Sequence, residues 1–440
     1  MLDKSYDVIV VGAGFSGLTA ARELSKKGYK TLILEGRDRM GGRTWFDNRM
    51  GRNLEMGGTY VHWFQPHIWA EISRYNLEVQ KVPDLNSAYW IADDKLNIGT
   101  EDEMFKKINE GMEVFLKDAK KYFPRPYEPF YNENIEDIDH LSVEDRLEEI
   151  KPEISKESYD LLRNEWSAYF CTDDLDKPGL TQAYRWLALS DYDWYTMEDI
   201  FELYKFKNGT KSLIDSIFND GEAEIKLSTP VSAITKTDNG HKVTTRNGEE
   251  FTSKAVVAAI PINVINNINF EPKLLDEKHQ ISDEKQTTEK GGKLWAKVRG
   301  FQDTSLFSGP EKYPVSSMHT DSIDGDVAYV MGYVGNVEKL DMENTEEVED
   351  LLRHWMPDLE IIESTGHNWT DDEFSKGTWP VLKKNQLTKY GKALRKSEDG
   401  LYLAGSDYAD GWAGFMDGAI ESGLTTADRV SKYLRKEKED

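Results

Sequence analysis

The chain has 440 residues, of which 38% are hydrophobic and 11% aromatic, enough for two globular domains and unlike a disordered protein. Its formal net charge of −25 excludes nucleic acid as a partner, because binding to phosphates requires a basic surface. The lack of an apolar run near 20 residues, the start of the first strand near Tyr6, and the single Cys171 predict a cytoplasmic protein with no membrane span, signal peptide or intrachain disulfide.

The N-terminal segment predicts a dinucleotide-binding unit. Residues 8–11 and 31–34 are apolar runs typical of buried strands, and a glycine-rich turn and a helical pattern lie between them. Gly12 allows a tight turn, Gly14 lets the backbone approach a pyrophosphate, and Gly17 lets helix and strand pack closely. The unpaired N–H groups at the start of the helix would face the phosphates.

The residues after the second strand extend this site. Glu35, at the tip of the strand, is placed to accept hydrogen bonds from ribose hydroxyls. Gly41 and Gly42 permit a second close approach of the backbone, and Arg37 and Arg43 can neutralise phosphate charge. A basic surface loop would not need a glycine pair beside its arginines, so we interpret this segment as part of the nucleotide site.

The rest of the chain alternates between helical and strand patterns, which indicates that it weaves between two domains. In chain order we predict a helix over 101–122, a proline-broken loop over 124–139, helices over 158–170 and 211–218, a hairpin over 233–245 with its turn at 238–240, a strand over 255–261, a sheet from 293 to about 390, and a strand, glycine turn and helix over 400–434.

Further segments resemble the flavin-containing amine oxidase family of the monoamine and polyamine oxidase type. They are residues 56–60 (Met-Gly-Gly-Thr-Tyr), 229–234 (Thr-Pro-Val-Ser-Ala-Ile), 403–407 (Leu-Ala-Gly-Ser-Asp) and 412–419 (Trp-Ala-Gly-Phe-Met-Asp-Gly-Ala). The resemblance implies an α/β fold in which a Rossmann-like FAD-binding domain is interwoven with a substrate domain of mixed sheet plus helices. The implied segments are 1–74, 208–290 and 391–440 for FAD, 75–207 for the helical part of the substrate domain, and 291–390 for its sheet.

The resemblance also implies the residues that hold FAD. They are Gly12, Ala13, Gly14, Ser16, Gly17, Glu35, Gly36, Arg37, Gly42, Arg43, Thr44, Gly58, Thr59, Tyr60, Val231, Gly405, Ser406, Asp407, Phe415 and Met416. Thr378 stands where some family members carry the cysteine that binds the flavin, and Cys171 is distant in sequence, so we expect non-covalent FAD. Asp407 replaces the more frequent glutamate and would still accept from the ribityl hydroxyls.

Three residues match family positions that act at the flavin or at the substrate amine. Lys293 matches a lysine that reaches the flavin N5 through a water, and the alternative is an exposed strand lysine. Trp379 and Phe415 match two rings that face each other across the substrate amine, although such residues are also common in cores. His62, Tyr184 and Trp186 are further candidates for the substrate pocket. Trp379 and the segment 57–67 resemble the nicotine and 6-hydroxynicotine oxidase branch.

The function that the resemblance implies is FAD-dependent amine oxidation. A hydride would pass from the carbon next to the amine to flavin N5, the imine would hydrolyse to an aldehyde or ketone, and O2 would reoxidise the flavin and yield H2O2. The substrate is a secondary or cyclic amine of nicotine type or an aliphatic mono- or diamine. No pair of carboxylates demands an acid–base role.

Other interpretations stay open. They are an amine dehydrogenase with a protein electron acceptor, another flavin oxidoreductase such as a desaturase or protoporphyrinogen-type oxidase, and a non-enzymatic flavin scaffold. His62 and His67 lack cysteine or acidic partners at ligand spacing, so no metal site is expected. Family members are often dimers, which leaves a homodimer open.

Overall fold

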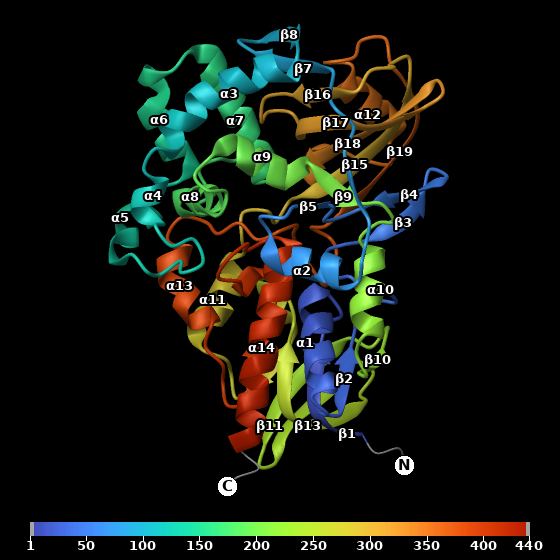
Figure 1. Ribbon diagram of the computed structural model, residues 1–440, viewed down its shortest axis with the longest axis vertical. Coiled ribbons are helices and arrows are strands. Elements are labelled where there is room, and N and C mark those ends of the chain that lie inside the picture. The colour runs from blue at the N-terminus through green and yellow to red at the C-terminus, as the bar shows by residue number, and fades with distance from the viewer. Residues whose placement is uncertain (1–3, 437–440) are drawn as a thin grey trace.

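The computed structural model describes residues 4–436, in which two parts lie along the long axis of the molecule (Figure 1). The lower part contains an eight-stranded sheet in the order β10-β2-β1-β13-β12-β11-β14, with β20 also paired to β13. Its strands are β1 (Ser5–Val11), β2 (Thr31–Leu34), β10 (Glu224–Lys226), β11 (Val231–Thr237), β12 (Gly240–Thr245), β13 (Glu250–Ala258), β14 (Asn269–Glu271) and β20 (Leu401–Leu403).

Strands β1, β2, β10, β13 and β20 pair in parallel, and helices cover both faces of this region. Burial on both faces explains why β1 and β2 are nearly continuous apolar runs. One face packs on α1 (Phe15–Lys26), α10 (Lys211–Asn219) and the long α14 (Met416–Lys436), and the other on η3 (Ile262–Asn267), α11 (Asp276–Glu284) and α13 (Gln386–Leu394).

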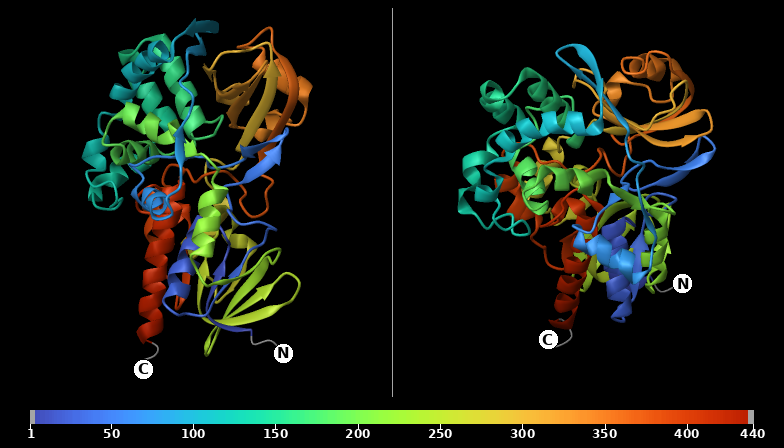
Figure 2. Two further views of the ribbon diagram at one scale, coloured as in Figure 1. Left: turned by 45° about the vertical axis from the view of Figure 1, so that its right-hand side comes forward. Right: turned by 45° about the horizontal axis from the view of Figure 1, so that its top comes forward.

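The upper part places a helical bundle beside a second sheet, as Figure 2 shows. This seven-stranded sheet has the order β19-β15-β18-β17-β16-β7-β8. Its strands are β7 (Ser87–Ala92), β8 (Lys95–Gly99), β15 (Gly292–Arg299), β16 (Ser305–Ser308), β17 (Val315–Asp324), β18 (Val327–Val334) and β19 (Glu360–Asn368). The helices are α3 (Glu101–Leu116), α4 (Ala119–Tyr122), η1 (Glu133–Ile135), α5 (Glu136–Asp139), α6 (Val143–Ile150), η2 (Lys151–Glu153), α7 (Lys156–Tyr169), α8 (Leu180–Leu189), α9 (Trp194–Glu202), η4 (Val337–Lys339) and α12 (Thr345–Leu352).

Short elements lie between the two parts. They are the hairpin β3 (Phe46–Arg49) and β4 (Arg52–Glu55), the three-stranded set β5 (Tyr60–Val61), β9 (Tyr204–Phe206) and β6 (Val79–Lys81), helix α2 (Pro66–Arg74), and η5 (Ser406–Tyr408). Because these segments cross from one part to the other, residues distant in sequence can meet at one cavity.

The structure confirms the α/β class and most of the predicted elements, including the hairpin, which is formed by β11 and β12 with a bulge after Val231. It differs from the predictions at three places. The helix predicted over 101–122 is interrupted between Leu116 and Ala119. The loop predicted over 124–139 ends early, because the side chain of Asn132 accepts from the N–H of Asn134 and starts η1. The upper sheet also takes β7 and β8 from a region predicted to be helical.

Candidate active site

A large cavity joins the two parts of the molecule. Its walls contain Gly12 after β1, Glu165 on α7, Val231 on β11, Lys293 on β15 and Phe415 before α14. These five residues come from the five chain segments distinguished in the sequence. The cavity is therefore one continuous space that begins at the glycine-rich turn and ends among the aromatic side chains of the upper part.

The three glycines of the first turn have different physical roles. Gly12 has φ +102°, and a Cβ there would lie 2.5 Å from the carbonyl oxygen of Ala259. A Cβ on Gly17 would lie 2.1 Å from the carbonyl oxygen of Gly12, so α1 can approach the strand only without a side chain there. At Gly14 a Cβ would meet nothing closer than 3.9 Å, so this position leaves space in front of the helix N-terminus.

A second glycine pair lies directly against the first turn. The N–H of Gly41 donates to the carbonyl of Ala13 at 2.9 Å. Glu35 is buried at the end of β2, where its carboxylate accepts from the N–H of Ala13 at 2.6 Å and from the N–H of Arg37 at 2.8 Å. The acidic side chain thus fixes both glycine segments while it lines the cavity.

The two predicted phosphate-binding arginines are held by acidic partners that the sequence did not reveal. Arg37 pairs with Asp372 and donates to the hydroxyl of Ser375 at 2.9 Å. Burial would raise the pKa of Asp372, but the hydrogen bond from His367 and the charge of Arg37 lower it to about 2. The acidic partner therefore stays ionised and holds the guanidinium at the cavity wall.

Arg43 lies at the centre of a second fixed group. It donates to the carbonyl of Thr378 and the hydroxyl of Ser406, each at 3.1 Å, and pairs with Asp407. Asp407 also accepts from the N–H of Ile262 at 3.0 Å. Asp407 thus lies behind Arg43 rather than on the cavity wall, so the predicted contact with ribityl hydroxyls stays a prediction and the observed role is to orient Arg43.

The cradle fits a dinucleotide such as FAD. The first turn of α1 has no side-chain cap, and the buried hydroxyl of Ser16, which lines the cavity, lacks a hydrogen-bond partner within residues 4–436. An uncapped helix N-terminus beside an unsatisfied hydroxyl suits an anionic, hydrogen-bonding ligand. Of the predicted cofactor residues, Ala13, Gly17 and Asp407 are not on the wall but support residues that are.

Lys293 is buried and lines the cavity, which contradicts the alternative of an exposed strand lysine. Only 3% of it is exposed. Its ammonium donates to the carbonyl of Gly57 at 2.9 Å and the hydroxyl of Thr59 at 2.7 Å. Burial lowers the pKa of Lys293 to about 8, although the nearby charges of Glu55 and Asp321 raise it.

The predicted aromatic pair lines the same cavity. The indole N–H of Trp379 donates to the carbonyl of Tyr169 at 3.1 Å, and its ring meets that of Tyr333 edge-on at 5.6 Å. Phe415 packs on Phe201, with ring centroids 5.2 Å apart. Tyr333 and Phe201 are wall residues that sequence reasoning missed, since nothing in their local pattern separates them from core aromatics.

Two predicted pocket residues do not line this cavity. Tyr184 is buried in the helical core, and its hydroxyl donates to the carbonyl of Phe115 at 3.2 Å. His62 is 1% exposed, its ring lies 3.8 Å from that of Trp63 at a tilt of 34°, and burial lowers its pKa to about 4. Of the three additional candidates only Trp186 reaches the wall.

The position of Cys171 also differs from expectation. Although distant in sequence, Cys171 lies beside Thr378, and both side chains contact Gly291. A Cβ added to Gly291 would lie 3.0 Å from the Sγ of Cys171 and 2.6 Å from the Cγ2 of Thr378. The thiol of Cys171 donates to the carbonyl of Val334 at 3.2 Å, and burial raises the pKa of the thiol to about 12. A thiol held neutral in this way is a poor nucleophile, so its proximity does not make it a flavin attachment point.

Three glutamates at the upper end of the cavity were missed by sequence reasoning. Glu198 and Glu202 lie one turn apart on α9, and Glu165 faces them from α7. The hydroxyl of Tyr169 donates to Glu198. Burial raises the pKa of Glu165 to about 8 and that of Glu202 to about 7, and it raises the pKa of Glu198 well above the ordinary value. One sequence signal could have found two of them. Glu198 and Glu202 follow the buried Trp194 at four-residue spacing, so they share its face of α9.

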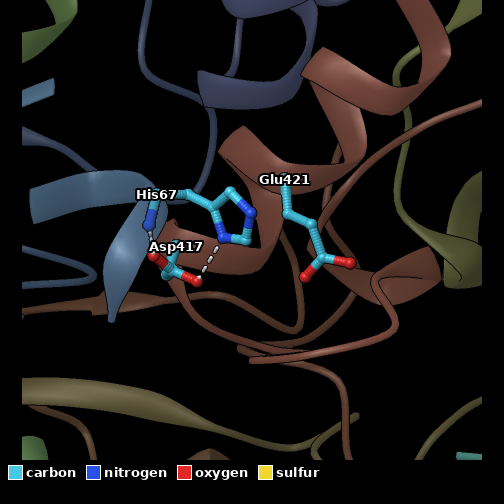
Figure 3. Close-up of side chains that lie close together, drawn as sticks. All are labelled: His67, Asp417 and Glu421. Carbon is cyan, nitrogen blue, oxygen red and sulfur yellow. Dashed lines mark hydrogen bonds and ion pairs between the residues drawn. The ribbon is translucent and has the colours of Figure 1, made fainter. Parts of the chain in front are cut away.

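His67 does have acidic neighbours, although they are distant in sequence. Figure 3 shows His67 between Asp417 and Glu421 of α14. Asp417 accepts from the ring of His67 at 3.0 Å and from the N–H groups of His67 and Ile68 at 2.6 and 2.9 Å. Glu421 accepts from two N–H groups of the 410–411 turn, each at 3.0 Å. Every carboxylate oxygen is thus already used, and the cluster joins α2 to α14.

The glycine cradle and the aromatic cavity above it define an oxidoreductase with a nucleotide cofactor. The sequence profile of the family described as flavin containing amine oxidoreductase matches residues 15–431, so the chain belongs to this family. It is therefore a flavoprotein that holds FAD and an oxidoreductase that acts on amines.

Individual relatives match nearly the whole chain. Pseudooxynicotine dehydrogenase of Pseudomonas sp. is 34% identical over 437 residues, which cover 98% of this chain and 87% of that protein. Nicotine dehydrogenase of Pseudomonas putida is 32% identical over 433 residues, or 98% and 89% of the two chains. The structure of wild-type putrescine oxidase bound to putrescine shares the fold, with a TM-score of 0.84 at 20% identity over 97% of this chain and 99% of the other.

One physical finding bears on the membrane. Among the described residues no helix combines the length and the apolar character needed to cross a bilayer.

Proposed function

We propose that this chain is an FAD-dependent amine oxidase that passes electrons to O2. The observation that supports the proposal best is the continuity of the cavity, which is lined by the glycine cradle, Lys293 and the pair Trp379 and Phe415. Bound FAD would supply the two-electron acceptor for the carbon next to the amine. We further propose that the FAD is non-covalent, because Thr378 has no thiol and Cys171 is buried as a neutral thiol.

The aromatic residues orient the amine. Their ring faces attract positive charge that develops at nitrogen, and the apolar wall favours the uncharged amine over the ammonium form. The indole of Trp379 is fixed by its hydrogen bond to Tyr169, and Phe415 is fixed by packing on Phe201. The amine nitrogen and its α-carbon are thereby held in one orientation while water is excluded.

Lys293 supplies the positive charge of the site. Its two hydrogen bonds to Gly57 and Thr59 hold the ammonium in place and leave its third proton for another acceptor. A fixed charge in a desolvated cavity stabilises negative charge that develops during electron transfer to O2. The product imine would hydrolyse to an aldehyde or ketone, and O2 would be reduced to H2O2.

A second candidate is an amine dehydrogenase that uses a protein acceptor. It is favoured by the names of the two dehydrogenase relatives, which are 34% and 32% identical to this chain. The amine site is the same in both candidates, so only the fate of the electrons differs. We also propose the five segment boundaries, a cytoplasmic location and a homodimer, each of which needs its own measurement.

The test is anaerobic mixing of the purified holoprotein with mono-, di- and polyamines and pyridine alkaloids. Bleaching of the flavin absorbance by amines supports amine oxidation, and no bleaching by any amine contradicts it. Admission of O2 then separates the candidates, because an oxidase regains its colour within seconds and yields H2O2 in equal amount, whereas a dehydrogenase stays reduced. Acid precipitation tests the attachment, since non-covalent FAD is released into the supernatant.

A further inference from the structure

The end of the cavity beyond the aromatic pair is acidic, which an apolar amine would not require. Glu165, Glu198 and Glu202 line it together with Tyr169 and Phe201. Phe201 packs on Phe415 at 5.2 Å and on Tyr169 at 5.1 Å, so one continuous aromatic wall connects the proposed amine position with the carboxylates. A molecule bound at Phe415 that extends along this wall would reach the glutamates.

The three glutamates lack a cationic side chain of their own. Among residues 4–436 no lysine or arginine forms an ion pair with any of them. The one basic side chain within 4 Å in this part of the chain is His319, whose ring nitrogen lies 3.7 Å from the carboxylate of Glu202. Burial lowers the pKa of His319 to about 4, so this ring is neutral. Burial raises the pKa of Glu202 and the charge of Lys293 lowers it, but the ammonium of Lys293 donates to Gly57 and Thr59 and not to a glutamate. Lys205 is already paired with Asp321.

Glu165 is the clearest sign that a ligand belongs here. It is 8% exposed, it faces the cavity, and it has no ion-pair partner among the described residues. Buried carboxylates are rare unless they are paired, because removal from water penalises the charged form. Glu165 is buried and Glu198 and Glu202 are half-buried, and all three line one cavity without a lysine or arginine partner among residues 4–436, which indicates that a cationic ligand completes the cluster.

We infer that Glu165, Glu198 and Glu202 bind a second, positively charged nitrogen of the substrate, distal to the amine that is oxidised. This inference rests on the proposed function and narrows it to substrates with two basic nitrogens. Because Glu198 and Glu202 are one helical turn apart, about 6 Å, they offer two positions for the distal nitrogen. The nitrogen is an alkylammonium or a pyridinium, and both present the same charge to the carboxylates.

The first experiment needs only the wild-type holoprotein. Steady-state turnover with O2 or an artificial electron acceptor, and reduction of the flavin under nitrogen, are compared for 1,4-diaminobutane and butylamine, for 1,6-diaminohexane and hexylamine, and for 4-(3-pyridyl)butylamine and 4-phenylbutylamine. We expect kcat/KM to favour the member with two nitrogens by about 10- to 100-fold in at least one pair, as for hydrogen bonds to charged groups. The alkyl pairs report an ammonium and the aryl pair a pyridinium.

The second experiment assigns the preference to the cluster. Glu165→Gln, Glu198→Gln and Glu202→Gln keep the side-chain shape and remove the charge. We expect the ratio of kcat/KM for the dibasic and monobasic substrates to fall about 10-fold or more in at least one variant. The loss should lie mainly in the Kd of the reductive half-reaction, with a smaller change in the limiting rate of reduction, because the distal nitrogen is remote from the reacting carbon.

The matched control is Asp199→Asn. Asp199 lies on the same helix between the two glutamates but is exposed and does not line the cavity, so its removal should leave the ratio unchanged. Flavin content and thermal unfolding identify any variant that fails to fold. Equal kcat/KM within every wild-type pair, with efficient bleaching by monoamines, would overturn this inference alone. A flavin that no amine bleaches would overturn the proposed function instead.

Discussion

At the scale of single residues, Lys293 changes its charge within the ordinary assay range. With a pKa lowered by burial to about 8, its ammonium is mostly protonated at pH 7 and mostly neutral at pH 9. Any step that uses the positive charge must therefore become slower as the pH rises through 8. The amino-acid sequence gives the position of this lysine, but it does not give the burial that sets its pKa.

We expect Lys293→Met to slow reoxidation of the reduced protein by O2 at least about tenfold at pH 7 and to abolish the fall in this rate above pH 8. Stopped-flow absorbance at several pH values measures both effects. Lys297→Met is the control, because Lys297 lies on the same strand but outside the cavity wall. A variant that retains the pH dependence of the wild type would show that another group carries the charge.

At the scale of elements, two glycines at the turn from β1 to α1 have different roles: Gly17 is needed for packing, and Gly14 leaves space for a ligand. Gly17 contacts the backbone of Gly12 so closely that any side chain would push α1 away from the sheet. Gly14 borders open space instead, and its φ of −75° is one that any residue can adopt.

We therefore expect Gly14→Ala to leave the stability of the flavin-free protein within about 1 kcal/mol of wild type while it weakens FAD binding, since the added methyl group occupies the place of the pyrophosphate. Gly17→Ala should lower both stability and FAD binding. Urea denaturation of the flavin-free proteins and fluorescence titration with FAD measure the two effects. Equal loss of stability in both variants would contradict the distinction.

The contact between α2 and α14 contributes to the free energy of unfolding, and this contribution depends on pH. Burial would lower the pKa of His67, but the hydrogen bond to Asp417 and the charges of Asp417 and Glu421 raise it above the ordinary value. A raised histidine pKa contributes stability that is fully present below the unfolded value, near 6.5, and is lost as the pH rises through the folded value.

His67→Gln is accordingly expected to lower the free energy of unfolding by about 1–2 kcal/mol at pH 6 and by less at pH 9. Urea denaturation at the two pH values checks the difference. His140→Gln serves as the comparison, because His140 is exposed and follows α5, outside the contact between α2 and α14. An equal effect of His67→Gln at both pH values would mean that the histidine acts only by packing.

Local patterns predicted the elements better than they predicted the walls of the site. The β1–α1–β2 unit, the hairpin and helix α10 follow from apolar periodicity, glycine and turn residues, which act within a few residues. Glycine cradles and a lysine on a strand are likewise visible in sequence. Strands β7 and β8 form a local hairpin, and they were missed because β7 joins the sheet through β16, more than 200 positions away.

At the scale of the whole molecule, the residues missed by sequence reasoning are those defined by long-range burial. Asp372 was not expected beside Arg37, nor Glu421 beside His67, and each pair spans more than 300 positions. The three cavity glutamates look like ordinary polar residues of amphipathic helices. Their importance depends on which helix face meets the cavity, and only the assembled fold determines that.

Because both parts of the molecule supply the cavity wall, we expect FAD to stabilise them together. At free FAD about 100-fold above its Kd, the gain in unfolding free energy is about 2.7 kcal/mol. Calorimetry of the holo and flavin-free proteins, with tryptophan fluorescence to follow the upper part, measures it. A tryptophan transition that does not shift with FAD would show that the cofactor stabilises only the lower part.

The parallel pairing of β13 with both β1 and β20 has a consequence for biosynthesis. Leu401–Leu403 leave the ribosome about 20–80 s after the first strand, at ordinary elongation rates. Until then residues 256–258 of β13, beyond the part covered by β12, lack a neighbour on one side, and Arg43 lacks its partners Ser406 and Asp407. Loading of the nascent polypeptide with its cofactor must therefore wait until translation is almost finished.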